Sequence, residues 1–121
     1  MEDSKKTNVL KEKSYVFALR IVKLSQYLVK EHKEYVLSKQ VLRSGTSIGA
    51  NLEEAFQGQS KLDFVHKLSI ANKEAFETHY WLRLLRDSDI LTKEQSSSRL
   101  ADCDELQRML VSAIKTSKAK L

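Results

Sequence analysis

The apolar residues of this chain recur every three or four positions in four successive segments, which is the period of amphipathic helices. We expect the first helix to begin between Asn8 and Ser14 and to end at about Lys33. Its apolar row comprises Phe17, Ile21, Leu24 and Leu28. Three further helices are expected over residues 36–57, over residues 60–87 and from residue 92 onward. Four helices of about 20 to 28 residues with short connections predict an all-α, antiparallel up-down-up-down four-helix bundle.

The stretch VLRSGTSIGANLEEAF, residues 41–56, is the part of the pattern that places glycine inside a helix. Gly45 and Gly49 are four residues apart, so they lie on one face of the second helix. Each interior glycine costs about 0.5 to 1 kcal/mol relative to alanine, and close approach of a neighbouring backbone would offset that cost. A phosphate-binding loop is not indicated, because GTSIGA lacks the required lysine and follows no strand. The charged residues nearby argue equally against a membrane helix pair.

Apolar residues at helical spacing form two rows on the second helix, so little of its surface should be exposed to solvent. We therefore expect it to be the most buried of the four helices. Its polar residues are Arg43, Ser44, Asn51, Glu53 and Glu54. Buried charges have to be paired or hydrogen-bonded. Arg43 and one of the two glutamates should therefore find partners on other helices or subunits.

Local signals indicate where the helices start and stop. Gly58 is placed to end the second helix in the left-handed conformation. Ser60 should cap the third helix, with Asp63 three residues later as a variant of the capping box. Thr92 should cap the fourth helix, with Gln95 completing its capping box.

The length of 121 residues suits one domain, which we place at residues 9–121 after a flexible tail of residues 1–8. The absence of proline and the presence of three glycines favour long helices. Cys103 is the single cysteine and cannot form an internal disulfide. The N-terminus has no apolar signal segment, and no apolar run approaches the length of a membrane helix. The expected location is the cytoplasm, without contact with a membrane.

The net charge is +5, and the excess of basic residues lies toward the two ends of the chain. An up-down-up-down bundle brings together the start of the first helix, the turn between the second and third helices, and the end of the fourth. Eight lysines would converge there: Lys5, Lys6, Lys11, Lys13, Lys61, Lys115, Lys118 and Lys120. This end could be a solvated surface that aids solubility or a surface that binds a polyanion.

Catalytic chemistry finds little support in the sequence. Di-metal sites in helix bundles need Glu-x-x-His pairs, but the residue three after Glu77 is Tyr80, and His79 follows Glu77 by only two. Cys103 lies on an apolar row, where a cysteine usually acts as a small hydrophobe. His79, Tyr80 and Trp81 could stack a base, although aromatics at helical spacing are more often core residues. We therefore expect no enzyme activity, no metal, no cofactor and no small-molecule substrate.

Two long motifs, VLRSGTSIGANLEEA and DFVHKLSIANKEAFETHYWLRLL, resemble the signature of bacterial four-helix-bundle proteins named after the 23S rRNA intervening sequence. The resemblance extends from about Val9 to Lys120. It implies a left-handed bundle, a homo-oligomeric ring, in particular a pentamer, and a basic surface suspected of binding nucleic acid. It implies no catalytic residue. The signature residues, read as packing and assembly residues, are Arg43, Ser44, Gly45, Gly49, Asn51, Glu53, Glu54, Glu74, Glu77 and Trp81.

Two functional hypotheses follow. The first is a non-enzymatic, oligomeric protein that binds nucleic acid, with RNA favoured over DNA. A ring would multiply the basic surface and raise avidity. The alternative is a structural or adaptor protein whose ring binds another protein.

Overall fold

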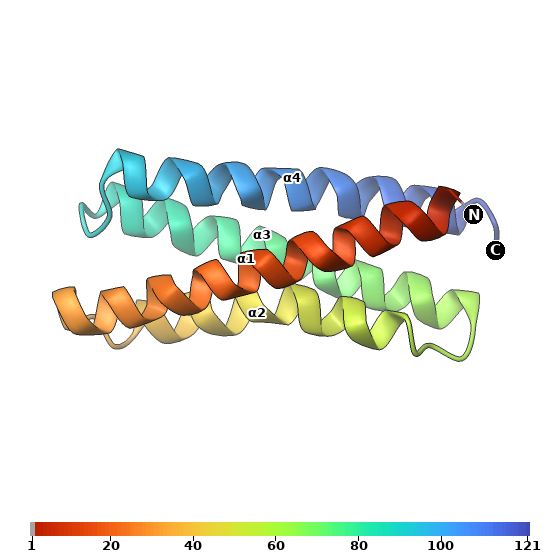
Figure 1. Ribbon diagram of the computed structural model, residues 1–121, viewed down its shortest axis with the longest axis horizontal. Helices are drawn as coiled ribbons and strands as arrows, with labels where there is room; N and C mark the ends of the chain where they lie inside the picture. Colours follow the sequence, from red (N-terminus) through yellow and green to blue (C-terminus); the bar gives the residue numbers. More distant parts are fainter. Residues whose placement is uncertain (1) are drawn as a thin grey trace.

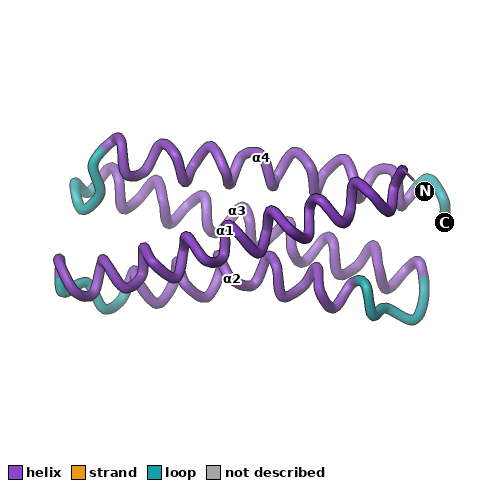
Figure 2. The backbone as a smooth tube through the Cα atoms, in the orientation of Figure 1, coloured by secondary structure: helices purple, strands orange, loops and turns teal. Residues whose placement is uncertain are grey.

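The computed structural model describes residues 2–121, and their regular structure consists of four helices without a strand. The helices are α1 (Glu2–His32), α2 (Leu37–Ala55), α3 (Lys61–Asp87) and α4 (Lys93–Lys118). Figure 2 shows that short loops connect them. The prediction of an all-α, four-helix fold is confirmed for the described residues.

Consecutive helices run in opposite directions, so that both ends of the chain lie at the same end of the molecule (Figure 1). Each helix contacts two others: α1 packs on α2 and α4, and α3 packs on α2 and α4. The α1–α4 contact is the smallest of the four. α1 and α3 therefore lie diagonally across the bundle. Its left-handed sense stays a prediction.

α1 begins at Glu2 and not between Asn8 and Ser14, so most of the segment expected to be a flexible tail is the first part of a helix. The physical reason is burial, because Thr7 is only 8% exposed and Leu10 only 1%. The polar composition of residues 1–8 suggested a tail. Local composition does not reveal packing against residues that are distant in the chain.

The expected caps of α3 and α4 are confirmed. The Ser60 side chain accepts a hydrogen bond from the backbone N–H of Asp63 at 3.0 Å. Thr92 and Gln95 form the full capping box, with each side chain accepting from the other residue's backbone N–H at 3.1 and 2.9 Å.

Gly58 does not end α2 in the left-handed conformation, because none of the described glycines has a positive φ. Its N–H instead donates to the carbonyl of Ala55 at 3.0 Å, which tightens the last turn. A Cβ at this position would lie 2.8 Å from a carboxylate oxygen of Asp63. That oxygen ends a flexible side chain, whereas the carbonyl oxygen of Ala55, 3.0 Å from such a Cβ, belongs to the backbone and leaves little room for a side chain here. The residues that follow a helix in the left-handed conformation are Lys33 after α1, with φ of 55°, and Asp89 after α3, with φ of 62°.

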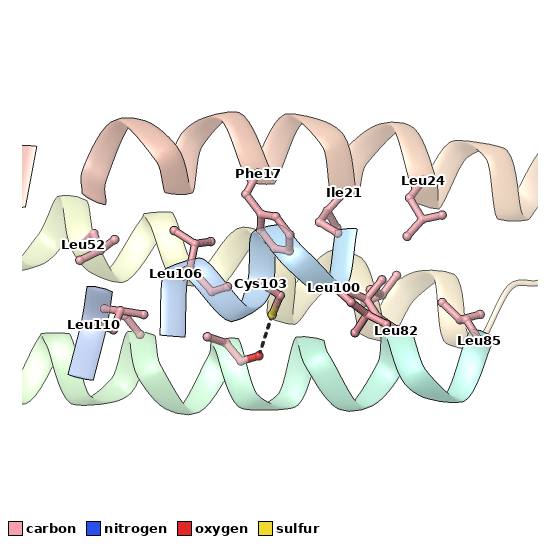
Figure 3. Packing of buried hydrophobic residues seen from close by; sticks show 14 of the residues in the cluster. Phe17, Ile21, Leu24, Leu52, Leu82, Leu85, Leu100, Cys103, Leu106 and Leu110 are labelled. Atoms are coloured by element: carbon pink, nitrogen blue, oxygen red, sulfur yellow. Dashed lines mark hydrogen bonds between the residues drawn. The ribbon is translucent and has the colours of Figure 1, made fainter. Parts of the chain in front are cut away.

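The core fills the space between all four helices with aliphatic side chains, Phe17 and Cys103 (Figure 3). Cys103 is fully buried, and its thiol donates to the carbonyl oxygen of Ala75 at 3.2 Å. Burial raises the pKa of this thiol from 9.0 to about 12, with a further contribution from Asp104 and Asp102. The thiol is therefore neutral and unreactive at neutral pH, which agrees with its interpretation as a small hydrophobe.

The two glycines of α2 bring this helix close to α1, as the sequence suggested. A Cβ on Gly45 would lie 2.8 and 2.9 Å from the two γ-carbons of Ile21, which is itself fully buried. A Cβ on Gly49 would lie 3.3 Å from the hydroxyl oxygen of Ser14. Gly45 therefore marks the tighter contact, since Ile21 branches at its β-carbon and cannot swing these atoms away.

We expect Gly45→Ala to lower the free energy of unfolding by about 1 to 3 kcal/mol, because overpacking outweighs the better helix propensity of alanine. Gly49→Ala is the matched control and should cost less. Ile21→Ala should relieve the clash, so a double-mutant cycle by urea denaturation should show favourable coupling between positions 21 and 45. A Gly45→Ala protein as stable as the wild type would show that the contact is not tight.

Cys103 should make stability depend on pH in the alkaline range. The unfolded chain loses the thiol proton above pH 9.0, whereas the folded chain keeps it up to about pH 12. The contribution of the protonated Cys103 thiol to the free energy of unfolding is therefore complete below pH 9.0. Above pH 9.0 it falls by about 1.4 kcal/mol per pH unit. The difference in unfolding free energy between wild type and Cys103→Ala should narrow accordingly on denaturation at rising pH. A difference that stays constant across this range would contradict the assignment.

Candidate nucleic-acid interface

The basic end of the bundle is formed by the first turns of α1, the α2–α3 loop and the last turns of α4, which Figure 1 shows at one end of the molecule. All eight lysines expected there lie in these segments or in the residues that adjoin them in α1, in α3 and after α4. Five of them are exposed and form no ion pair with a described carboxylate. These are Lys5, Lys6, Lys61, Lys115 and Lys118.

Lys11 and Lys13 differ from these five because carboxylates on neighbouring helices compensate their charges. The Lys11 ammonium lies 3.3 Å from the Glu53 carboxylate on α2 and 5.0 Å from the centre of the Phe56 ring. The Lys13 ammonium lies 3.2 Å from the Glu105 carboxylate on α4. Both therefore contribute less to the attraction of a polyanion than the sequence suggested.

Two adjoining hollows lie at the basic end, and Thr7 and Ser117 line both of them. The first has a volume of about 600 Å³ and lies between the helix ends, with Lys61 and Lys120 among its lining residues. The second has a volume of about 460 Å³ and lies between α1 and α4, with Lys5 and Lys6 on the α1 side. Lys115 and Lys118 line neither hollow and extend the basic surface along α4.

Arg108 is a basic residue of this surface that the sequence reasoning missed. It is exposed on α4 and lines the hollow between α1 and α4 opposite Lys5 and Lys6. It precedes Lys115 by seven residues, which places both on one face of the helix. That spacing is the signal that could have identified it.

Among the signature residues, Arg43 of α2 and its acidic partners on α3 join the two helices. The Arg43 guanidinium pairs with Glu74 at 3.2 Å and with Glu77, whose carboxylate also accepts from the indole N–H of Trp81 at 2.9 Å. The side chain of Arg43 is half exposed, so this charge is not one of the buried polar groups of α2. The expectation that it finds partners on another helix is confirmed.

The other polar signature residues of α2 form hydrogen bonds or ion pairs, either within the helix or with neighbouring helices. Ser44 is buried and accepts a hydrogen bond from the Thr78 hydroxyl of α3 at 2.9 Å. The Asn51 amide donates to the carbonyl of Ser47 at 2.8 Å. Glu54 pairs with Lys67 at 2.9 Å, so both glutamates of the signature, Glu53 and Glu54, form ion pairs. This hydrogen bond and the charge of Glu54 raise the pKa of Lys67.

The aromatic side chains that could have stacked a base lie far along α3 from the basic end, about 20 residues or 30 Å beyond Lys61. His79 contacts the Asp104 carboxylate at 3.0 Å, and Trp81 is bonded to Glu77. The basic end offers ammonium, guanidinium and hydroxyl groups, and such groups commonly contact phosphate oxygens.

Among the described residues, no cluster of three or more histidine, cysteine or carboxylate side chains is arranged to hold a metal ion. None of the described helices combines the length and the apolar character that crossing a bilayer requires.

Comparison with known proteins agrees with the two sequence motifs. The family model for the 23S rRNA-intervening sequence protein matches residues 6–112. The chain is also similar to a protein of unknown function from the S23 ribosomal protein family of Bacteroides thetaiotaomicron VPI-5482, known from its crystal structure. The two are 56% identical, the match covers 91% of this chain and 98% of the other, and the TM-score is 0.90. No curated protein matches the chain. The chain belongs to the 23S rRNA-intervening sequence protein family.

Proposed function

We propose that this protein is a non-enzymatic, cytoplasmic nucleic-acid-binding protein and that its basic end binds the phosphate backbone of RNA. The observation that carries the proposal is the gathering of five exposed lysines from three distant chain segments without a described carboxylate partner. Lysine ammonium groups release counterions from the nucleic acid when they bind it. The family's name links it to 23S rRNA, which favours RNA over DNA as the ligand.

The proposal predicts a specific change in the salt dependence of RNA binding. Replacing Lys5, Lys6 and Lys61 with alanine should reduce the slope of log K against log salt by about 2 for single-stranded RNA and by about 3 for a duplex, if each lysine contacts one phosphate. Affinity at low salt should fall by more than about tenfold. Fluorescence anisotropy with labelled structured RNA and duplex DNA at several salt concentrations measures both quantities.

The matched control removes the same charge from exposed lysines away from the basic end: Lys23, Lys30 and Lys39. This variant should keep most of the slope and the affinity. An equal loss in both variants would mean that net charge alone drives binding, and no binding of the wild type at low salt would reject the function.

We also propose that left-handed up-down-up-down bundles of this chain assemble into a ring, with five copies as the family resemblance implies. Two exposed apolar stripes support this assembly. One lies on α1 and includes Tyr15, Val16 and Leu19, which are 49–63% exposed. The other lies on α3 and includes Phe76, Tyr80 and Leu84, which are 38–58% exposed.

The placement of the stripes favours a ring over a two-fold dimer. They lie on the diagonal helices α1 and α3, so they point in different directions from the bundle axis. A head-to-tail contact between α3 of one copy and α1 of the next buries both stripes in every copy, and it closes into a ring when the rotation allows. An isologous dimer through either stripe would leave the other exposed to water.

We expect Tyr15→Glu and Phe76→Glu each to reduce the assembly to monomers, since each places a charge in the contact. Each variant keeps one intact stripe, so mixing the two should give a heterodimer through that single competent contact. Light scattering coupled to size-exclusion chromatography measures the masses. Val111→Glu, at an exposed position of α4 outside both stripes, is the control and should keep the wild-type mass.

Monomers that stay monomeric on mixing would contradict a head-to-tail contact. If the wild type is itself a monomer, the α3 stripe instead favours the second candidate function, an adaptor that binds another protein. Copurification from cells with and without nuclease separates the two, because a protein partner survives the nuclease and a nucleic acid does not.

A further inference from the structure

The hollow between α1 and α4 has an apolar floor that binding to phosphates does not explain. We call it the α1–α4 groove. Its floor and walls include Val9 and Leu10 from α1 and Met109 and Ala113 from α4. Leu10 is 1% exposed and belongs to the core, whereas Val9 is 42% exposed. The groove therefore leads from solvent directly onto the core, with aliphatic carbon and a thioether as its surface.

The edge of the α1–α4 groove that faces solvent carries cationic and hydroxyl groups. Lys5 and Lys6 stand on the α1 side and Arg108 on the α4 side. Ser112 and Thr116 are exposed on α4 between these charges and the chain terminus. None of the described residues that line the groove is acidic. A ligand that fits must combine an apolar body with a negative group.

The dimensions of the groove narrow the choice of ligand further. Its α4 wall runs from Arg108 to Ser117, a rise of about 14 Å along the helix. Its volume of about 460 Å³ is spread along this length. A single extended hydrocarbon chain matches this shape, whereas a flat membrane surface needs a convex or planar apolar face to insert.

We propose that the α1–α4 groove binds a free, single-chain anionic amphiphile, such as a medium-chain carboxylate. The hydrocarbon chain lies on Val9, Leu10, Met109 and Ala113, and the carboxylate is held by Arg108 with Lys5 and Lys6. This site was not expected from the sequence, because its two walls are about one hundred residues apart in the chain. The proposal is independent of nucleic-acid binding, although Lys5 and Lys6 border both surfaces.

The proposal can be tested with the full-length protein and the fluorescent probe dansylaminoundecanoic acid, whose emission rises when it enters an apolar site. Decanoate should displace the probe, and decanol, which has a similar chain without the charge, should displace it less well. Circular dichroism and thermal melting establish that each variant is folded.

Two variants test the two halves of the groove. Ser112→Trp, at an exposed position, should fill the groove and weaken probe binding by about tenfold or more. Arg108→Ala should weaken decanoate by about fivefold and leave decanol unchanged, which reduces the preference for the carboxylate. Lys118→Ala removes a charge from the same end of the molecule but outside the groove. It should leave the binding of the probe, of decanoate and of decanol unchanged.

Several outcomes would overturn the proposal. One is the absence of a fluorescence rise with the wild type, and another is binding that Ser112→Trp leaves intact. Equal displacement by decanoate and decanol would reject the role of the cationic edge. Sedimentation with phosphatidylglycerol vesicles without binding of the monomeric probe would assign the surface to a membrane. None of these assays contains nucleic acid, so failure here is distinguishable from failure of RNA binding.

Discussion

The contact between Gly45 of α2 and Ile21 of α1 is the constraint on which the packing of this bundle depends. The absence of a side chain at position 45 lets the γ-carbons of Ile21 occupy the space that a Cβ would need. The contact lies between two buried apolar faces and is reinforced one turn later by Gly49 against Ser14. Because overpacked cores are costly, the contact fixes the position of α1 relative to α2.

α1 meets α4 in a different way. Beyond the shared core, the edges of these two helices are joined by polar pairs: Arg20 with Asp102, Lys13 with Glu105, and Tyr27 with Gln95 at 3.1 Å. Their contact is the smallest in the bundle, and it is here that the apolar α1–α4 groove opens. The close α1–α2 contact therefore gives the bundle its rigidity. The looser α1–α4 side supplies the accessible surface on which the proposed amphiphile binding depends.

Local chemistry explains which parts of the structure could be predicted from the sequence. The caps at Ser60 and Thr92 were predictable because each rests on residues three apart. The four helices were predictable because their apolar rows are long. The start of α1 was not, since Thr7 becomes buried only through contacts with distant parts of the chain. The role of Gly58 was also missed, because this glycine lies close to the backbone carbonyl of Ala55 and does not adopt a positive φ.

The candidate interface was predictable in outline and not in detail. Helix order alone brings the lysines of three segments to one end. Which of them remain uncompensated depends on cross-helix geometry, as the pairs Lys11–Glu53 and Lys13–Glu105 demonstrate. Arg108 could have been found from its spacing to Lys115. The α1–α4 groove could not, because its shape depends on how far two helices from opposite ends of the chain stand apart.

Amide hydrogen exchange is the most direct test of the claim that α1 is held mainly by α2. Exchange through local opening reports the stability of each region separately. Amides of α2 around Gly45, and of α1 around Ile21, should exchange only by global unfolding. Amides of α4 facing the α1–α4 groove should exchange through smaller openings. Slower exchange in that part of α4 than around Gly45 would show that α1 is not held mainly by α2.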